Sequence, residues 1–160
     1  FGYLGSQEKA QTDWAEAEKI IAVNLLGAIS ILTLVSSYFE QKQKGTIVII
    51  SSVAGDRGRQ SNYVYGAAKG GLSLFSQGLR QRLAKKGVKV ITIKPGFVAT
   101  PMTYGLDLPK PLVASAEKVA EDIFQALMKG KDVVYTPWYW RPIMGVIKAL
   151  PESLFKRLNV

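Results

Sequence analysis

The sequence predicts an α/β fold, with a parallel sheet that looks like the second half of a doubly wound fold. Helical patterns alternate with short β-branched runs along the chain, as they do when helices wrap a parallel sheet. The first of these runs, 46–51 (TIVIIS), is apolar at nearly every position, which is typical of a strand covered on both faces. Three such strands make a thin sheet, so we expect the first βαβ half to be absent from the chain.

Composition bounds the chemistry. The chain has 160 residues, of which 48% are hydrophobic, enough for one domain with a real core. It contains neither Cys nor His, which excludes disulfides, thiol nucleophiles, the Ser-His-Asp triad and most metal sites. The net charge of +9 suits nucleic acid, anionic lipid, a phosphorylated ligand or a plain basic surface equally well. No nucleic-acid partner is expected, since the chain lacks a helix-turn-helix, RNP-like or zinc pattern.

The first helix is expected to begin after Thr12 and to end before Gly45, behind a loop over residues 1–11 that glycine and serine interrupt. Residues 20–39 carry no charge and are long enough to span a bilayer. Polar side chains within that stretch favour instead a helix buried between the sheet and a partner subunit. They are Asn24, Ser30, Thr33, Ser36 and Ser37.

The remaining elements follow in order. We expect a loop over 53–62, a helix over 63–86, a strand over 88–94, a helix over 115–129 and a strand over 132–136. Gly87 and Gly130 follow the two helices, as glycine does at helix ends. Ser115 is placed to cap the second of them.

Residues 137–160 form an aromatic and basic C-terminal arm of the same domain, whose main part is 1–136. Pro142 and Pro151 interrupt the arm, and two short helices split at Pro151 are expected. Aromatic rings, an apolar stripe and basic side chains suit a segment that lies on an anionic membrane. The alternative is that the arm packs over the substrate cleft or a neighbouring subunit.

Three polar residues suggest acid–base chemistry. Tyr65 and Lys69 are four residues apart in an expected helix, so their side chains share a face. A nearby ammonium favours the phenolate, and it moves a phenol with a pKa near 10 toward useful acid–base strength. Ser52 follows a strand, at the sheet edge where open α/β folds bind ligands. Tyr and Lys at this spacing alone occur in many helices by chance.

Two further segments accompany these residues in order. Asn24 lies in Val-Asn-Leu-Leu-Gly, and Pro-Gly-Phe-Val-Ala-Thr over 95–100 directly follows the next strand. From Asn24 to Thr136 the chain resembles the short-chain dehydrogenase/reductase family. The resemblance implies a cytoplasmic Rossmann-type enzyme that moves a hydride between NAD or NADP and a carbonyl or secondary alcohol. It also implies a homodimer or homotetramer, buried through the helices over 13–39 and 63–86.

The resemblance assigns a role to each residue. Tyr65 would be the general acid that protonates the carbonyl oxygen, and Ser52 would polarise that oxygen. Lys69 would lower the pKa of Tyr65 and bind the nicotinamide ribose, while Asn24 would hold a water in a proton relay. Tyr65 would contact the cofactor as well, and the cofactor side would be completed by Pro95, Gly96, Val98 and Thr100. An ordinary turn that ends a strand is the alternative for that last group, and a helix kink is the alternative for Asn24.

The chain also departs from the family pattern. The glycine-rich turn that holds the pyrophosphate is absent, and Gly55-x-x-Gly58, the nearest spacing, follows the wrong strand. The residues that would distinguish NAD from NADP are absent with it. A second hypothesis is therefore an incomplete, non-catalytic chain that acts only as a dimerising domain.

The tail narrows the resemblance further. The segments 94–103 and 133–141 resemble those of decaprenylphosphoryl-2-keto-pentofuranose reductases. Such a resemblance implies a lipid-linked keto-sugar as the substrate.

Overall fold

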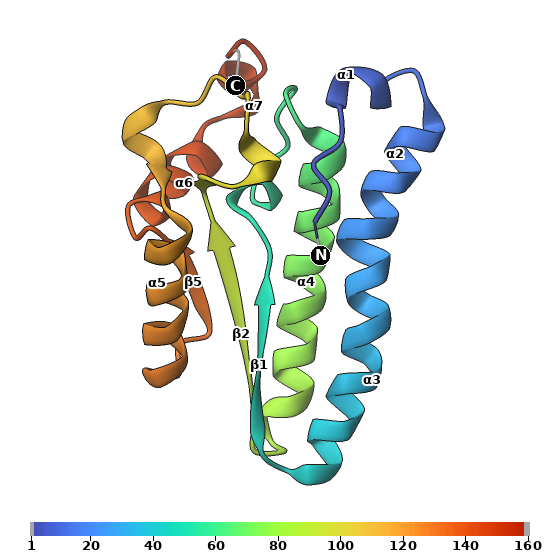
Figure 1. Cartoon of the computed structure of the whole chain (residues 1–160), viewed down its shortest axis with the longest axis vertical. Coiled ribbons are helices and arrows are strands. Elements are labelled where there is room, and N and C mark those ends of the chain that lie inside the picture. The colour runs from blue at the N-terminus through green and yellow to red at the C-terminus, as the bar shows by residue number, and fades with distance from the viewer. Residues whose placement is uncertain (1, 159–160) are drawn as a thin grey trace.

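A three-stranded parallel sheet lies at the centre of the molecule (Figure 1). The computed structural model describes residues 2–158. The sheet has the order β1-β2-β5, built from β1 (Gly45–Ile50), β2 (Val88–Pro95) and β5 (Val133–Thr136). β1 pairs with β2 from Gly45↔Val88 onward, and β2 pairs with β5 from Thr92↔Val133 onward. The α/β class and the three expected strands are confirmed.

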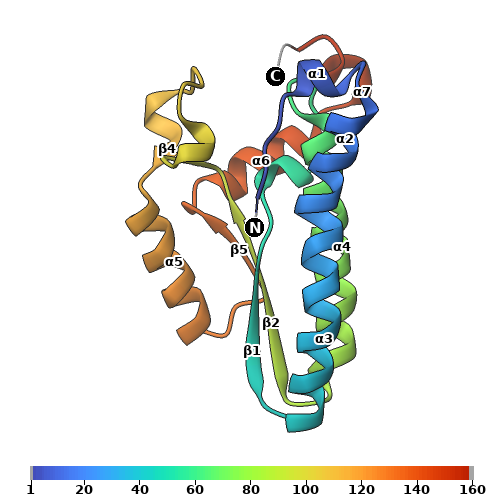
Figure 2. The ribbon, with the colours of Figure 1, turned by 45° about the vertical axis from the view of Figure 1, so that its right-hand side comes forward.

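Helices cover both faces of this sheet. α3 (Gly27–Lys42) and α4 (Tyr63–Ala84) lie on one face, and α5 (Ala116–Met128) lies on the other (Figure 2). Alternate strand residues serve the two faces: Ile47 and Val90 pack with helix α4, whereas Ile91 and Ile93 pack with α5. Both sides of the strands are therefore apolar, which explains the unbroken run that first indicated a buried strand.

The first long helix begins where the sequence predicts. Asp13 caps α2 (Trp14–Ile21) by accepting a hydrogen bond from the Ala15 amide at 2.9 Å. A π-helical segment, Ala22–Leu26, joins α2 to α3. The expectation of a plain loop before Thr12 is wrong, because Ser6 caps a one-turn helix, α1 (Gln7–Ala10). Ser6 does not interrupt a helix, because its side chain accepts from the Lys9 amide and so serves as an N-cap.

One helix among residues 2–158, Trp14–Lys42, is long and apolar enough to cross a membrane. One of its faces packs against the core through residues such as Leu25, Leu32 and Val35. The opposite face is open, with Leu34 75% exposed. The chain alone thus covers one face of the helix, and burial of the other face would need a partner.

The connection between β2 and α5 contains structure that the sequence did not predict. β3 (Phe97–Val98) and β4 (Val113–Ala114) pair as a second, parallel sheet. Short 3-10 turns over Pro101–Thr103 and Lys110–Leu112 lie between them. Strands of two residues are too short to show a periodicity, so they left no pattern to detect. Ser115 caps α5 as expected, accepting from the Lys118 amide.

The C-terminal arm packs on the rest of the chain. α6 (Trp140–Ala149) lies at the carboxyl ends of the strands (Figures 1 and 2), followed by α7 (Glu152–Phe155) after Pro151. The expectation that Pro142 interrupts the arm is wrong, because Pro142 lies in the first turn of α6, where a proline is tolerated. Trp140 and Met144 are buried beside Val53 and other apolar side chains.

Arg57 fastens this arm to the loop that follows β1. Its guanidinium donates to the main-chain oxygens of Ile147 at 2.9 Å and Leu150 at 2.6 Å, at the end of α6. It also lies 4.0 Å from the centre of the Phe155 ring. These contacts support the packing alternative for part of the arm.

Candidate active site

Glycines allow α4 to approach the loop after β1 closely. A Cβ on Gly55, in the 3-10 turn Val53–Gly55, would lie 2.5 Å from the Gly70 amide nitrogen. A Cβ on Gly66 would lie 2.9 Å from the Ala54 oxygen. The two backbones therefore meet with no side chain between them, which brings the first turns of α4 beside Ser52. Of the two glycines in the Gly55-x-x-Gly58 spacing, only Gly55 takes part in this contact, because a Cβ on Gly58 would meet nothing within 4 Å.

Ser51 fixes α4 along its axis. Its hydroxyl donates to the Lys69 carbonyl at 2.8 Å and lies 2.8 Å from the hydroxyl of Ser73. Its amide donates to the Ile93 oxygen at 2.8 Å, which continues the pairing of β1 with β2. All of these groups are buried. Ser51 thus fixes the position of Lys69 relative to the carboxyl ends of β1 and β2.

Ser52 and Tyr65 face each other across this contact. The Ser52 hydroxyl accepts from the Ala54 amide at 3.1 Å and hydrogen-bonds the Tyr65 side chain. Burial raises the pKa of the Tyr65 phenol, and the bond with Ser52 lowers it by a smaller amount. The expectation that the neighbouring ammonium leaves this pKa lowered is therefore wrong for the chain alone, because desolvation outweighs the other contributions.

Lys69 lies one turn further along α4. Its ammonium donates to the Ile50 oxygen at 3.2 Å and lies 5.7 Å from the centre of the Tyr65 ring. The residue is only 4% exposed, and burial lowers the pKa of its side chain to about 8. An ammonium has three donors, so donors beyond the Ile50 contact are available to a ligand.

The burial of Lys69 predicts a characteristic dependence of stability on pH. Its pKa is lower in the folded chain, about 8, than the ordinary value of 10.5, so the folded state disfavours the charge. We expect this penalty, on the order of 3 kcal/mol, to apply in full below pH 8 and to fade as the pH rises toward 10.5. Wild-type chain should gain stability relative to Lys69→Met between neutral and alkaline pH, as measured by urea unfolding. Parallel pH profiles for the two proteins would contradict this assignment.

Asn24 lies within the π-helical segment Ala22–Leu26, which contacts α4. Its amide group donates to the main-chain oxygens of Tyr3 at 2.6 Å and Ile20 at 2.8 Å, and its side-chain oxygen accepts from the Tyr3 amide. The side chain is 1% exposed. These contacts fit the helix-kink alternative and tie the N-terminal segment down. Local π-helical geometry also recurs at functional sites, so the water-holding role stays a prediction.

The segment after β2 ends close to the Ser52 loop. Phe97 follows Gly96, and Val53 follows Ser52. Both Phe97 and Val53 pack in one apolar cluster with Trp140. Gly96 is required there, because a Cβ would lie 1.9 Å from the Trp140 ring.

Val98 and Thr100 make turn contacts in the structure. The Val98 carbonyl accepts from the Thr103 hydroxyl at 2.6 Å, and Thr100 and Thr103 form a reciprocal capping box. Their contacts match a turn that ends a strand, and a part in cofactor binding stays a prediction.

Comparison with known proteins shows the family to which the chain belongs. The family model described as short chain dehydrogenase matches residues 2–109. The chain belongs to the short-chain dehydrogenase family. It is 40% identical over 158 residues to an uncharacterized oxidoreductase of Mycobacterium tuberculosis strain H37Rv, covering 99% of this chain and 63% of that protein. An uncharacterized oxidoreductase of Streptomyces coelicolor is 34% identical over the whole chain and 63% of its own length. The chain thus spans under two thirds of these relatives.

Solved short-chain dehydrogenases share the fold. One from Burkholderia cenocepacia, in complex with NADP, has a TM-score of 0.80 at 23% identity, covering 93% of this chain and 61% of that one. Another, from Sphingobium yanoikuyae with NADPH, has a TM-score of 0.74 at 22% identity over 96% and 62% of the two chains. The Rossmann-type fold class is confirmed.

The structure adds a group that the sequence analysis missed. Asp56, Lys94 and Tyr135 meet in the interior at the carboxyl end of the sheet. A signal was available, because Lys94 lies in the continuously buried part of β2, residues 90–95, and a buried ammonium requires a partner. Within residues 2–158, no three carboxylates lie together as a metal site would require.

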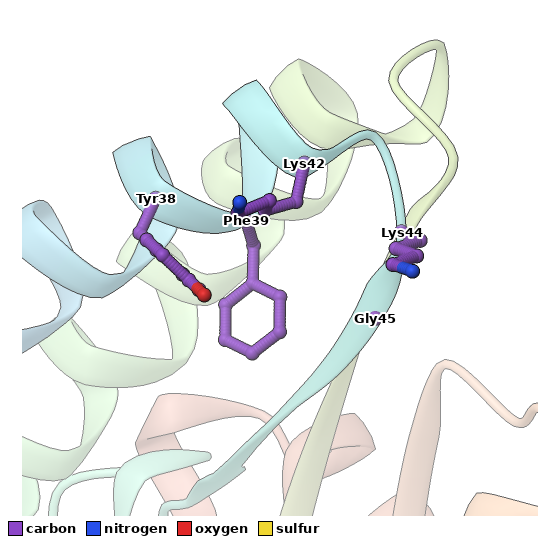
Figure 3. Close-up of a pocket in the computed structure, with 5 residues that line it drawn as sticks. All are labelled: Tyr38, Phe39, Lys42, Lys44 and Gly45. Atoms are coloured by element: carbon purple, nitrogen blue, oxygen red, sulfur yellow. The ribbon is translucent and has the colours of Figure 1, made fainter.

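An open pocket of about 530 Å³ lies elsewhere in the molecule. It is lined by Tyr38, Phe39, Lys42, Lys44 and Gly45, at the turn between α3 and β1 (Figure 3). The strands begin there, whereas Ser52, Tyr65 and Lys69 lie where they end. This pocket is therefore separate from the candidate active site.

Proposed function

We propose that these residues form the acid–base half of an NAD(P)-dependent oxidoreductase that interconverts a carbonyl and a secondary alcohol. The observation that carries the proposal is that Ser52, Tyr65 and Lys69 lie close together. The side chains of Ser52 and Tyr65 are hydrogen-bonded, and the Lys69 ammonium lies 5.7 Å from the centre of the Tyr65 ring. With neither His nor Cys in the chain, a half-buried phenol beside a buried ammonium is the acid–base pair that the fold provides.

Each side chain has a definite task in this proposal. Ser52 hydrogen-bonds the substrate oxygen, and Tyr65 delivers a proton to that oxygen during reduction. Lys69 binds the ribose hydroxyls of the cofactor with the donors that Ile50 does not use, and its charge favours the phenolate once Tyr65 has lost its proton. A nicotinamide cofactor supplies the hydride when bound. The chain thus has residues that could bind the nicotinamide end of the cofactor. The glycine-rich turn that would bind its pyrophosphate is not among the 160 residues.

The test uses an extended protein, made by joining the glycine-rich dinucleotide-binding half of a short-chain dehydrogenase in front of Phe1. We expect it to bind NAD or NADP, followed by nicotinamide fluorescence, and to oxidise the reduced cofactor in the presence of a panel of ketones. The 160-residue chain should bind dinucleotide much more weakly. An extended protein that binds cofactor but turns over no carbonyl or alcohol would leave the dimerising, non-catalytic hypothesis in its place.

For the substrate we propose a bulky ketone with an apolar carrier, of which a polyprenyl-phosphoryl keto-sugar is the specific candidate. The C-terminal arm offers exposed apolar side chains that could contact such a carrier: Trp138 is 76% and Val146 66% exposed. A fold neighbour at 22% identity, with a TM-score of 0.72, bears the description bulky-bulky ketone specific alcohol dehydrogenase, from Comamonas testosteroni. Competition between small ketones and a short-chain prenyl-phosphoryl keto-sugar for turnover tests this choice.

The exposed side of the arm also supports a proposal of peripheral membrane contact. Basic residues accompany it, including Arg141, Lys148 and Lys156, and each adds about 1 kcal/mol near an anionic surface. Co-sedimentation of the extended protein with anionic vesicles at low salt, with and without residues 137–160, tests the proposal. Equal binding by both forms would leave only the packing role already seen for Trp140 and Met144.

We also propose a homodimer through the open face of α3. Ile31, Leu34 and Tyr38 recur at helical spacing on that face, and all three are exposed. Leu34→Glu is expected to convert the dimer to a monomer in light scattering, because it places a charge in the apolar contact. Leu106→Glu, a matched change at an exposed loop leucine, should leave the dimer intact. A monomeric unmodified protein at micromolar concentration would contradict the proposal.

A further inference from the structure

A buried ion pair links two segments that the proposed mechanism uses. The Lys94 ammonium hydrogen-bonds one oxygen of Asp56, and the Tyr135 hydroxyl donates to the other oxygen at 2.6 Å. The Asp56 side chain is 3% exposed and that of Lys94 10%. We call these three residues the Asp56 clamp. Both carboxylate oxygens have a partner, so the orientation of the carboxylate is fixed from two sides.

The clamp joins three elements at one end of the sheet. Lys94 and Tyr135 are register partners in β2 and β5, and the Lys94 ammonium lies 5.5 Å from the centre of the Tyr135 ring. Burial and the bond to Asp56 both raise the pKa of the Tyr135 phenol, so it remains a donor at physiological pH. Asp56 comes from the turn between β1 and α4. Side chains from strands β2 and β5 thus anchor the turn that contains Asp56, although neither strand pairs with that turn.

Asp56 is rigidly connected to Ser52. The Ser52 carbonyl accepts from the Gly55 amide at 3.2 Å, and the Val53 carbonyl accepts from the Asp56 amide at 3.1 Å. These bonds form one 3-10 turn, capped by the Ser52 hydroxyl itself. A displacement of Asp56 is therefore transmitted to Ser52 over a single turn. On the other side, Lys94 directly precedes Pro95-Gly96.

We propose that Asp56 is a positioning residue, which sets the Ser52 hydroxyl at a fixed distance from the Pro95-Gly96 segment by gripping Lys94 and Tyr135. The inference rests on the proposed function, in which Ser52 binds the substrate oxygen and Pro95-Gly96 lies beside the nicotinamide. A buried ion pair contributes little net stability, because desolvation offsets the attraction between the charges. Its contribution here is alignment, and a misplacement of about 1 Å in an active site lowers the rate on the order of a hundredfold.

The test compares the removal of two different carboxylate hydrogen bonds, made to neighbouring residues of β5. Asp56→Asn with Lys94→Met removes both charges of the clamp, so no unpaired charge is left buried. Asp122→Asn is the matched control. Asp122 accepts a hydrogen bond from the hydroxyl of Thr136 at 2.7 Å. Thr136 directly follows Tyr135 in β5, but this bond does not reach the Ser52 loop. In the extended protein we expect the double variant to lose about ten- to a hundredfold in kcat, with cofactor Kd unchanged. Asp122→Asn should keep its kcat.

Amide hydrogen exchange provides a readout that does not depend on turnover. The double variant should exchange faster at the Gly55 and Asp56 amides, and Asp122→Asn should not. If the unmodified extended protein transfers no hydride, the proposed function is wrong, but the clamp is not. In that case, faster amide exchange in the double variant would still support the clamp. A folded double variant with unchanged kcat and unchanged exchange, or a control with the same loss, would overturn it.

Discussion

Tyr65→Phe in the extended protein is expected to lower carbonyl reduction by about a hundred- to ten-thousandfold, the usual contribution of a positioned general acid. The substitution removes one oxygen and keeps the ring, so the contact with Lys69 and the fold should persist. Cofactor Kd should change little, because in the proposed mechanism Lys69 supplies most of the contact with the ribose.

The matched control lies on the same helix. Tyr63 is 44% exposed and two residues before Tyr65, so it points away from the Ser52 loop. Tyr63→Phe is expected to retain normal turnover, and steady-state kinetics of the two variants measures the difference. Near-normal turnover in Tyr65→Phe would remove Tyr65 from the mechanism.

Gly55→Ala is expected to impair both folding and catalysis. The added Cβ would lie 2.5 Å from the Gly70 nitrogen and 2.6 Å from the Lys69 carbonyl carbon, both of them backbone atoms that cannot rotate aside. Forcing α4 away from the loop should lower the free energy of unfolding by about 1–3 kcal/mol. It also separates Ser52 from Tyr65, with a rate loss on the order of a hundredfold.

Gly58→Ala tests whether this effect is specific to the contact. Gly58 lies three residues later in the same loop, and a Cβ there meets nothing within 4 Å. Urea unfolding and kcat should both stay close to the unmodified values. Equal destabilisation by the two changes would show that the loop is generally sensitive, and that the close approach of the two backbones is unimportant.

The elements that could be predicted are those whose pattern repeats over several turns or residues. The position of Asp13 before a long apolar run predicts the start of α2, and the β-branched runs predict β1 and β2. β3 and β4 have two residues each, and their pairing depends on where β2 and α5 place them. Local patterns contain no information about such a contact.

The candidate site was predictable in composition but not in electrostatics. Ser52, Tyr65 and Lys69 stood out by spacing and by their place after a strand, yet the pKa of Tyr65 depends on how deeply the phenol is buried. Burial is set by the packing of α4 on the turn Val53–Gly55, which only the folded chain reveals. Asp56 escaped detection for the same reason, since its partners Lys94 and Tyr135 are distant in sequence.

Transfer of deuterium is the most direct test of the central claim that Ser52, Tyr65 and Lys69 carry out acid–base chemistry in a hydride transfer. The extended protein is mixed with reduced cofactor deuterated at the transferring carbon and with a ketone substrate, and the product alcohol is analysed by mass spectrometry. We predict one deuterium per product molecule, and almost no product from Tyr65→Phe. Product formed without deuterium, or formed equally well by Tyr65→Phe, would contradict the claim.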